Sequence, residues 1–164
     1  MKLKLKPNTI EACKKILFHC GNLTADESLL IITDDSTKDI GNIIYQISLE
    51  TNNNSSHKTI KKFNIHGEEP PADISEMMYD CDLIIGLTSM SMAHTQARFR
   101  ATNNGSRYLS LPDYSWKIVE DNSLKADFRE LLGIAEKIGK LLDNSDLVRI
   151  TTDLGTDIQL SISG

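Results

Sequence analysis

The signals for a strand, a helix and a second strand follow one another in residues 82–111, DLIIGLTSMSMAHTQARFRATNNGSRYLSL. This stretch opens with DLIIGL, an almost continuous apolar run that is typical of a strand buried on both faces. Thr95 can cap a following helix, and Ala97 and Ala101 give that helix a flat face that allows close approach to a sheet. Gly105 predicts the end of the helix, and RYLSL follows as a strand. The stretch therefore predicts one crossover of a parallel sheet.

The same alternation of strand and helix signals extends outward to residue 146. A second apolar run, SLLIITDD at 28–35, predicts the central strand, and KTIKKFNIH at 58–66 predicts a weaker strand near a sheet edge. Helices are expected at residues 8–21, 37–50, 71–81 and 123–146. Such alternation implies a parallel sheet with helices on both of its faces. We therefore predict an α/β fold with three layers, α/β/α, around a mostly parallel, flavodoxin-like sheet.

The end of the sequence follows a different pattern. Apolar and polar residues alternate strictly over 158–163, and the tripeptide DLG before them favours a tight turn, which predicts a C-terminal antiparallel hairpin with one wet face. This divides the chain into a parallel α/β domain at 1–146 and a terminal hairpin at 147–164. Because the last strand is half exposed, we expect either that a partner covers it or that a second domain follows Gly164.

Composition excludes several classes of partner. The 164 residues carry a net charge of −5, and their lysines and arginines are scattered, which disfavours nucleic acid. No apolar run approaches the ~18 residues that a membrane span needs. The 3 cysteines form no CxxC pair and fit a reducing compartment. We therefore expect a cytoplasmic protein with no nucleic-acid and no membrane partner.

Candidate functional residues are those that follow the predicted strands, because ligands of open parallel sheets bind at the carboxyl ends of the strands. Asp34 and Asp35 could hold a cation or could cap the next helix, and capping is the interpretation we favour. His66 stands in HGEE, which lacks the HExxH spacing of a metal-binding helix, so it is interpreted as a solvated loop residue. The other candidates at this edge are Thr88 to His94, Asp113 and Tyr114.

The sequence lacks residues that two classes of phosphate-binding protein require, namely phosphoacceptor receiver domains and nucleotide-binding domains. A phosphoacceptor receiver domain would accompany the acids of IITDD with an aspartate at the end of its third strand, but that strand reads LIIGL, and no lysine follows a fifth strand. GLTSMSMAHT contains neither GxGxxG nor GxxxxGK[ST], so no nucleotide-binding loop is expected. A thiol enzyme is disfavoured as well, because the cysteines fall in or beside predicted helices.

The turn and helix at 88–105 contain the strongest candidates for ligand binding. Ser91 lies in the serine-rich turn, and His94 and Arg98 are four positions apart, so their side chains can point the same way. Together with Asp35 they could line a pocket for a small anion such as a carboxylate at the helix N-terminus. The plainer interpretation, which we favour, is that Arg98 pairs with a nearby acid and that His94 packs at the rim of the sheet.

Residues 68–115 and 155–164 together resemble the amino-terminal half of the aminopeptidase S/T family of thermophilic-type metallo-aminopeptidases. The matching features are Pro70 and Pro71, the strand Asp82–Ile85, the turn Ser89–Thr95, the helix Ala97–Ala101 and the strand entry Asn104–Arg107. The closing GTDIQLSISG is similar to the strand that leads into the second domain of that family.

The resemblance implies a non-catalytic amino-terminal scaffold domain of a two-domain, often dimeric peptidase. In that family the second domain holds paired divalent metals (zinc, cobalt or manganese). The resemblance therefore implies neither a catalytic residue nor a metal ligand in this chain. Whether this chain is itself an enzyme is left open. The same architecture is similar to the dihydroxypyridine ring-opening dioxygenases, whose iron ligands also lie in the later half. The alternatives are therefore an amino-terminal domain of such a dioxygenase, or a module for small-anion binding or homodimerisation.

Overall fold

The computed structural model of the chain describes residues 7–163. Residues 1–6 and 164, which belong to the two predicted domains, lie outside the described residues. Contacts divide the chain into two compact units, Met1–Ala126 and Asp127–Gly164, called here the first and the second unit. The long helix that the sequence analysis assigned to the sheet domain therefore groups with the hairpin. The predicted domain division at residue 146 stays a prediction.

The first unit is built on a parallel sheet of four strands. These are β1 (Leu29–Thr33), β2 (Ser55–Thr59), β3 (Leu83–Leu87) and β4 (Arg107–Ser110), in the spatial order β2-β1-β3-β4. In the register of the sheet, Ile31 pairs with His57 on one side and with Ile85 on the other. Every residue of β1 and β3 is buried, which confirms the two apolar runs as central strands.

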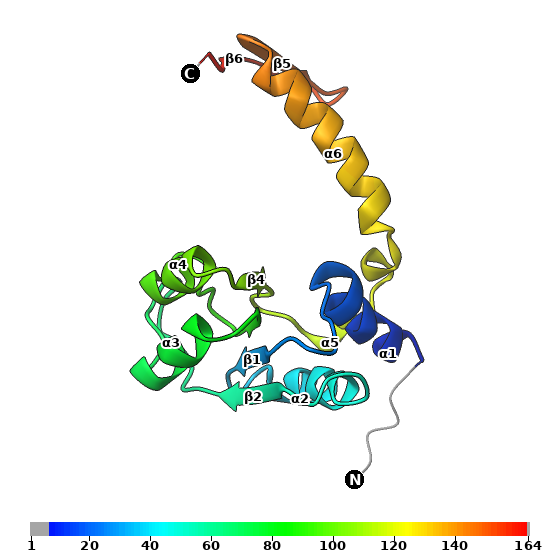
Figure 1. The fold of residues 1–164 in the computed structure, drawn as a ribbon. Coiled ribbons are helices and arrows are strands. Elements are labelled where there is room, and N and C mark those ends of the chain that lie inside the picture. The colour runs from blue at the N-terminus through cyan, green and yellow to red at the C-terminus, as the bar shows by residue number, and fades with distance from the viewer. Residues whose placement is uncertain (1–6, 164) are drawn as a thin grey trace. The chain divides into compact units, whose positions relative to one another are not determined.

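Helices cover both faces of this sheet (Figure 1). On one face lie α1 (Pro7–Lys14), its π-helical continuation η1 (Lys15–Cys20) and α2 (Lys38–Ser48); on the other lie α3 (Ala72–Tyr79) and α4 (Gln96–Asn103). A short helix that the sequence did not predict, α5 (Trp116–Val119), and the 3-10 turn η2 (Asn122–Lys125) follow β4. The predicted α/β fold with a mostly parallel sheet is confirmed.

The edge strand β2 differs from the prediction. The sequence placed a strand at 58–66, whereas the observed strand is the polar segment Ser55–Thr59. Ile60 and Phe63 are buried after the strand has ended, and Ile65 is 66% exposed. The ladder of an edge strand is made by backbone groups, so it does not require apolar side chains. The apolar residues mark the return of the chain to the core and not the strand itself.

The strand–helix–strand stretch that opened the sequence analysis is confirmed in detail. The Thr95 hydroxyl accepts a hydrogen bond from the Arg98 N–H at 3.2 Å, which is the predicted N-cap of α4. Ala97 and Ala101 are buried against the sheet together with Ile84. Gly105 ends the segment with a φ of 106°, a backbone conformation that favours glycine.

The second unit contains α6 (Phe128–Asp143), which is shorter than the predicted helix at 123–146, and the strands β5 (Leu147–Thr151) and β6 (Asp157–Ser161). The strands are antiparallel, with Ile150 opposite Ile158, which confirms the predicted hairpin. Within 7–163 no helix is both long enough and apolar enough to cross a membrane.

Candidate functional site at the carboxyl edge of the sheet

Asp34 is the best-connected side chain at the carboxyl edge of the sheet. It directly follows β1 and is fully buried. One carboxylate oxygen accepts hydrogen bonds from the N–H and the hydroxyl of Ser36, at 2.9 and 2.5 Å, and the other accepts those of Ser89, at 2.7 and 2.5 Å. Burial alone would raise the pKa of Asp34, but the hydrogen bonds outweigh it and hold the pKa below its ordinary value. Asp34 is therefore an ionised anchor between β1 and the loop after β3.

This geometry decides between the two interpretations of the aspartate pair. The carboxylate of Asp34 is engaged by four donors of the chain itself, and its carbonyl accepts the N–H of Thr37 and of Lys38, so it supports the start of α2 instead of presenting oxygens to a cation. The side chain of Asp35 is 83% exposed and forms an ion pair with Lys38 at 3.0 Å. The pair thus serves local structure, but neither side chain caps α2 as the capping interpretation expected, because the N-cap is Thr37 and it forms no side-chain cap hydrogen bond.

Ser91 ties the loop after β3 to the segment after β2. Its N–H donates to Nδ1 of His66 at 2.9 Å, and its carbonyl accepts the N–H of Gly67 at 2.8 Å. Because Nδ1 is the acceptor, a neutral His66 carries its proton on Nε2. His66 is exposed, as expected of a loop residue, but it also joins two of the loops that form this edge.

The N-terminus of α4 is already occupied by a carboxylate of the chain. Glu69 accepts hydrogen bonds from the N–H of Gln96 at 2.5 Å and of Ala97 at 3.1 Å. A negative charge at this end of a helix is favoured by the helix dipole and by the free N–H groups there. An anion at this point was expected from the sequence, but Glu69 could not be identified as that anion, because no local spacing connects it with a helix that begins 27 residues later.

Arg98 is held by oxygen atoms of its own loop and helix. Its Nε donates to the Ala93 carbonyl at 2.6 Å, and its Nη1 donates to the Thr102 hydroxyl at 3.4 Å. The plainer sequence interpretation expected an acid as the partner of Arg98; the partners found within the described part of the chain are Ala93 and Thr102.

The four candidate residues do not all come together. Ser91, His94 and Arg98 lie at one loop–helix junction, where the Ser91 hydroxyl accepts the Ala93 N–H at 3.1 Å and His94 is exposed. Asp35 instead bonds Lys38 in solvent. Ligand binding by Ser91, His94, Arg98 and Asp35 stays a prediction.

Tyr108 is a further residue near this edge that the sequence analysis did not single out. It lies on β4 with its hydroxyl over Gly86 of β3, where a Cβ would come within 2.2 Å of the hydroxyl oxygen. Burial raises the pKa of Tyr108 to about 12, so the phenol stays neutral. The only signal in the sequence is the glycine that interrupts the apolar run LIIGL.

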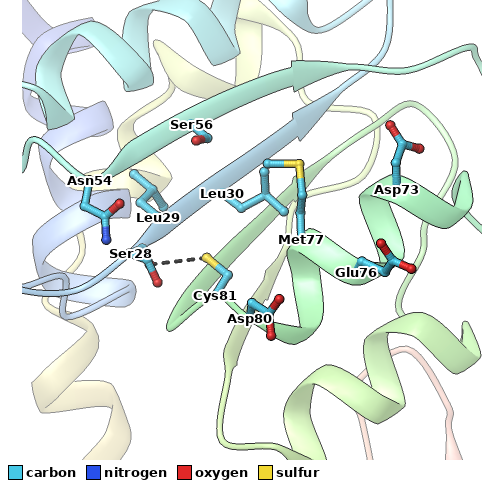
Figure 2. A pocket seen from close by; sticks show the side chains of 10 residues that line it. All are labelled: Ser28, Leu29, Leu30, Asn54, Ser56, Asp73, Glu76, Met77, Asp80 and Cys81. Atoms are coloured by element: carbon cyan, nitrogen blue, oxygen red, sulfur yellow. Dashed lines mark hydrogen bonds between the residues drawn. The ribbon is translucent and has the colours of Figure 1, made fainter.

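A separate cleft of about 410 Å³ lies between α3 and the amino-terminal parts of β1 and β2 (Figure 2). Met77 and Leu30 line its apolar wall, and three acids form its rim: Asp73 and Glu76 of α3, and Asp80, which directly follows α3. The Cys81 thiol donates to the Ser28 carbonyl at 3.3 Å, and burial raises its pKa, which leaves it an unreactive thiol. No pattern in the sequence indicates this cleft, because acids spaced in this way are typical of a solvated helix face.

The described residues contain no group of three or more histidine, cysteine, aspartate or glutamate side chains that could hold a metal ion. A non-heme iron site of the common kind needs two histidines and one carboxylate with open positions. The side chains at 7–163 therefore do not fit such a centre by themselves.

The comparisons with known proteins point to one family. The family model described as NicX, 2,5-dihydroxypyridine 5,6-dioxygenase, matches residues 8–164. The solved structure of a 2,5-dihydroxypyridine dioxygenase from Pseudomonas putida KT2440 is similar in fold, with a TM-score of 0.67 at 12% identity. The match covers 96% of this chain and 48% of that one, so the chain spans about half the length of the solved relative. A search of curated proteins found no match.

These findings correct the resemblance to the aminopeptidases. Both the family match and the similar structure are dioxygenases, so the assignment to an aminopeptidase, a metallopeptidase or a hydrolase is wrong. The strand, turn and helix that suggested it are present in the structure, but such elements of an α/β fold do not identify an activity. The expectation of zinc, cobalt or manganese rested on that resemblance alone and loses its support.

Proposed function

The chain belongs to the NicX, 2,5-dihydroxypyridine 5,6-dioxygenase, family, and from this premise we propose that it forms the amino-terminal part of an enzyme that opens a dihydroxypyridine ring with dioxygen. The observation that carries the proposal is the family match, which extends over residues 8–164. The similarity in fold to a solved dioxygenase agrees with it.

The reaction named by the family determines what the protein has to bind. A 5,6-dioxygenase breaks the bond between C5 and C6 and adds one atom of O2 to each carbon. C5 carries a hydroxyl group and becomes a carboxyl group, while C6 becomes a formyl group on the ring nitrogen. The four electrons that reduce O2 come from the ring, so no other reductant is needed. The product carries a carboxylate at neutral pH, and the substrate carries acidic hydroxyl groups. Both therefore favour binding by cationic or hydrogen-bonding side chains of the protein.

Iron of the kind common in such oxygenases finds no ligand set at 7–163. We propose that its ligands come from a second domain beyond Gly164, equivalent to the part of the solved relative that this chain does not cover. The present chain would then provide a wall of the active site and not the metal centre.

The junction formed by Ser91, His94 and Arg98 is the part of this chain best suited to that role. It lies at the carboxyl edge of a parallel sheet, where ligands of such folds bind. Arg98 is fixed by the Ala93 carbonyl, which orients a cation without neutralising it, and the exposed imidazole of His94 can donate or accept a hydrogen bond. The N-terminus of α4 is less suited, because an external anion would have to displace Glu69 there.

A titration followed by NMR tests this role directly. We expect 2,5-dihydroxypyridine to shift the amide signals of residues 89–98 with a Kd of about 1 mM, weak because only part of the site is present. Unsubstituted pyridine, which lacks both hydroxyl groups, is the matched control and should cause smaller shifts. The His94→Asn variant should weaken binding, whereas Lys117→Gln, an exposed position on α5, should not. Shifts centred on Asp73 and Asp80, or no shifts, would refute the assignment to the carboxyl edge.

A measurement of oxygen uptake tests the proposal that the iron ligands lie outside this chain. Residues 1–164, supplied with ferrous iron and 2,5-dihydroxypyridine, should consume no more O2 than the iron and the substrate alone. Enzymatic ring opening by this chain would contradict the proposal that the metal ligands lie elsewhere.

A further inference from the structure

The cleft beside α3, called here the α3 cleft, lies at the opposite end of the sheet from the carboxyl edge. It is bounded by α3 on one side and by the amino-terminal parts of β1 and β2 on the other (Figure 2). Its volume of about 410 Å³ is in the range of small-molecule sites. All of its lining residues belong to the first unit. The proposed ring opening makes no use of this cleft, so what it binds is a separate question.

The walls of the α3 cleft offer apolar contact and neutral hydrogen-bonding groups. Leu30 is buried in the wall formed by β1, and Met77 of α3 is half-buried opposite it. Methionine has an unbranched, adaptable side chain that can follow the shape of an apolar ligand. Towards β2, the side chains of Asn54 and Ser56 have no hydrogen-bond partner among the described residues. These walls can therefore accommodate a ligand with both apolar and hydrogen-bonding parts.

The charged groups of the α3 cleft are all negative. They are Asp73, Glu76 and Asp80, and none of the 10 residues labelled in Figure 2 is basic. The three carboxylates are exposed, and within the described part of the chain they have neither an ion pair nor a hydrogen bond. Arg100 of α4 borders a neighbouring hollow, where it lies over the Tyr79 ring, 5.6 Å from the ring centroid. No positive charge of the first unit thus neutralises these acids.

This arrangement of acids is unfavourable as long as no cation is bound. Glu76 and Asp80 are four positions apart, a spacing at which like charges on a helix repel each other. They also stand in the last turn and at the C-cap of α3, where the helix dipole disfavours negative charge. A cation in the α3 cleft would relieve both effects. Charge complementarity therefore indicates a cationic occupant.

The spacing of the acids indicates an extended cation with several charges. Asp73, Glu76 and Asp80 follow one another at intervals of three and four residues, so that successive Cβ atoms are about 5–6 Å apart. The described residues contain no group of three acids, histidines or cysteines that could hold one metal ion. A chain of ammonium groups separated by three or four methylene groups has a similar spacing between its charges. Its methylene groups can lie against Met77 and Leu30, as the stem of a lysine lies on an apolar surface.

We propose that the α3 cleft is a binding site for a linear aliphatic polyamine. The ammonium groups pair with the three carboxylates, the methylene groups cover the apolar wall, and the Ser56 hydroxyl and the Asn54 amide oxygen accept the remaining N–H groups. A lysine-rich peptide has the same kind of charge, but it carries its ammonium groups on separate side chains of a bulky backbone. A cleft of small-molecule size favours the polyamine.

A titration of the full chain with spermidine, followed by NMR, provides the first test. We expect the amide signals of residues 28–30, 54–56 and 73–81 to shift with a Kd of about 0.1 mM. Butylamine, which has one ammonium group and a similar apolar part, should bind about tenfold more weakly, because it can pair with only one carboxylate. Binding of spermidine should also weaken as salt is added. No shifts, or shifts spread evenly over the acidic residues of the chain, would overturn the proposal.

A triple variant tests whether the three acids bind the ligand. Asp73→Asn, Glu76→Gln and Asp80→Asn combined should weaken spermidine binding by about 30-fold, or about threefold for each charge removed. The matched control combines Glu11→Gln, Asp39→Asn and Glu50→Gln, which removes three exposed charges from the α1 and α2 side of the sheet. Its affinity for spermidine should stay within about twofold of that of the natural protein. Equal losses in the two triple variants would show attraction by net charge alone and would refute the site.

Thermal melting of the same variants tests the argument from unneutralised charge. Without ligand, the cleft variant should melt no lower than the natural protein, because it loses repulsion and no attractive contact. Spermidine should raise the melting temperature of the natural protein and leave that of the cleft variant unchanged. A cleft variant that melts well below the natural protein would show that the acids already have partners in the fold, which contradicts the proposal.

A peptide of equal charge distinguishes the two kinds of occupant. Acetylated trilysine amide carries as many ammonium groups as spermidine and should bind more weakly, because its backbone does not fit beside Met77 and Leu30. If the peptide binds the α3 cleft more tightly than spermidine does, the occupant is a basic segment of a protein and the assignment to a polyamine is wrong.

Discussion

Replacement of Asp34 by asparagine tests the anchor at the carboxyl edge of the sheet. The carboxylate accepts four hydrogen bonds, two from Ser36 and two from Ser89. In asparagine, one of the two oxygens becomes an NH2 group that faces a backbone N–H. One charge-assisted hydrogen bond is then lost and a buried donor is left without an acceptor, which together cost about 3 kcal/mol of the free energy of unfolding. For a unit of this size, we expect the melting temperature to fall by about 10 °C.

The matched control is Asp35→Asn at the neighbouring position. That side chain is 83% exposed and pairs only with Lys38, so no measurable change is expected. Urea unfolding followed by the fluorescence of Trp116 is the suitable assay, because this single tryptophan lies in α5 of the first unit. If Asp34→Asn lowers the unfolding midpoint no more than Asp35→Asn does, the Asp34 carboxylate does not stabilise the fold.

The same variant has a characteristic dependence on pH. The pKa of Asp34 is lower in the folded chain than in the unfolded chain, where it is about 3.9. The stabilisation is therefore fully present above that value and is lost as the pH falls through the folded pKa. The difference in unfolding free energy between the natural protein and Asp34→Asn should thus be largest at pH 7 and should shrink below pH ~4. A difference that grows on acidification would contradict the assignment of an ionised carboxylate.

Three further variants test other contacts of the first unit. Gly86→Ala should lower the free energy of unfolding by about 2 kcal/mol because its Cβ would meet the Tyr108 hydroxyl, and the double variant with Tyr108→Phe should recover part of the loss in a urea titration. Glu69→Gln should cost about 1 kcal/mol and speed hydrogen exchange in the first turn of α4, because the charge at the helix N-terminus is removed; unchanged exchange there would argue against the contact. Glu27, whose pKa the Arg107 guanidinium lowers to about 2, should contribute about 1 kcal/mol at neutral pH. Glu27→Gln should remove this contribution. In the natural protein the contribution fades as the pH falls from 4.5 toward 2, so the two proteins should become equally stable there. A difference in unfolding free energy that persists at pH 2 would contradict the ion pair as its cause.

Local chemistry explains why much of the fold could be predicted. The runs at 29–33 and 83–87 are apolar on both sides, and only a central parallel strand buries both sides. Thr95 marks the start of α4 through a hydrogen bond with Arg98, three residues later, and Gly105 marks its end through its own backbone φ. Both signals are local in the sequence. The edge strand β2 could not be predicted in the same way, because the position of Ser55–Thr59 is determined by the backbone of β1.

The candidate site shows where sequence reasoning fails. Ser91, His94 and Arg98 could be selected because they follow one strand within a single turn and helix. The contacts of Asp34 with Ser89 and of Glu69 with Gln96 join residues 55 and 27 positions apart, and no pattern of spacing connects them. The aminopeptidase assignment failed for a related reason, because it relied on a succession of strand, turn and helix, whereas function resides in side chains that the fold does not specify.

The parallel α/β architecture, the crossover at 82–111 and the amphipathic character of α6 and the hairpin could all be predicted, because each follows from the periodicity of neighbouring residues. The folded chain was needed to see that Asp34 is an anchor instead of a cation ligand and that Glu69 fills the helix end where an external anion was expected. The physical reason is that a hydrogen bond to a buried carboxylate depends on which loops meet in space, and that meeting is set by the whole sheet.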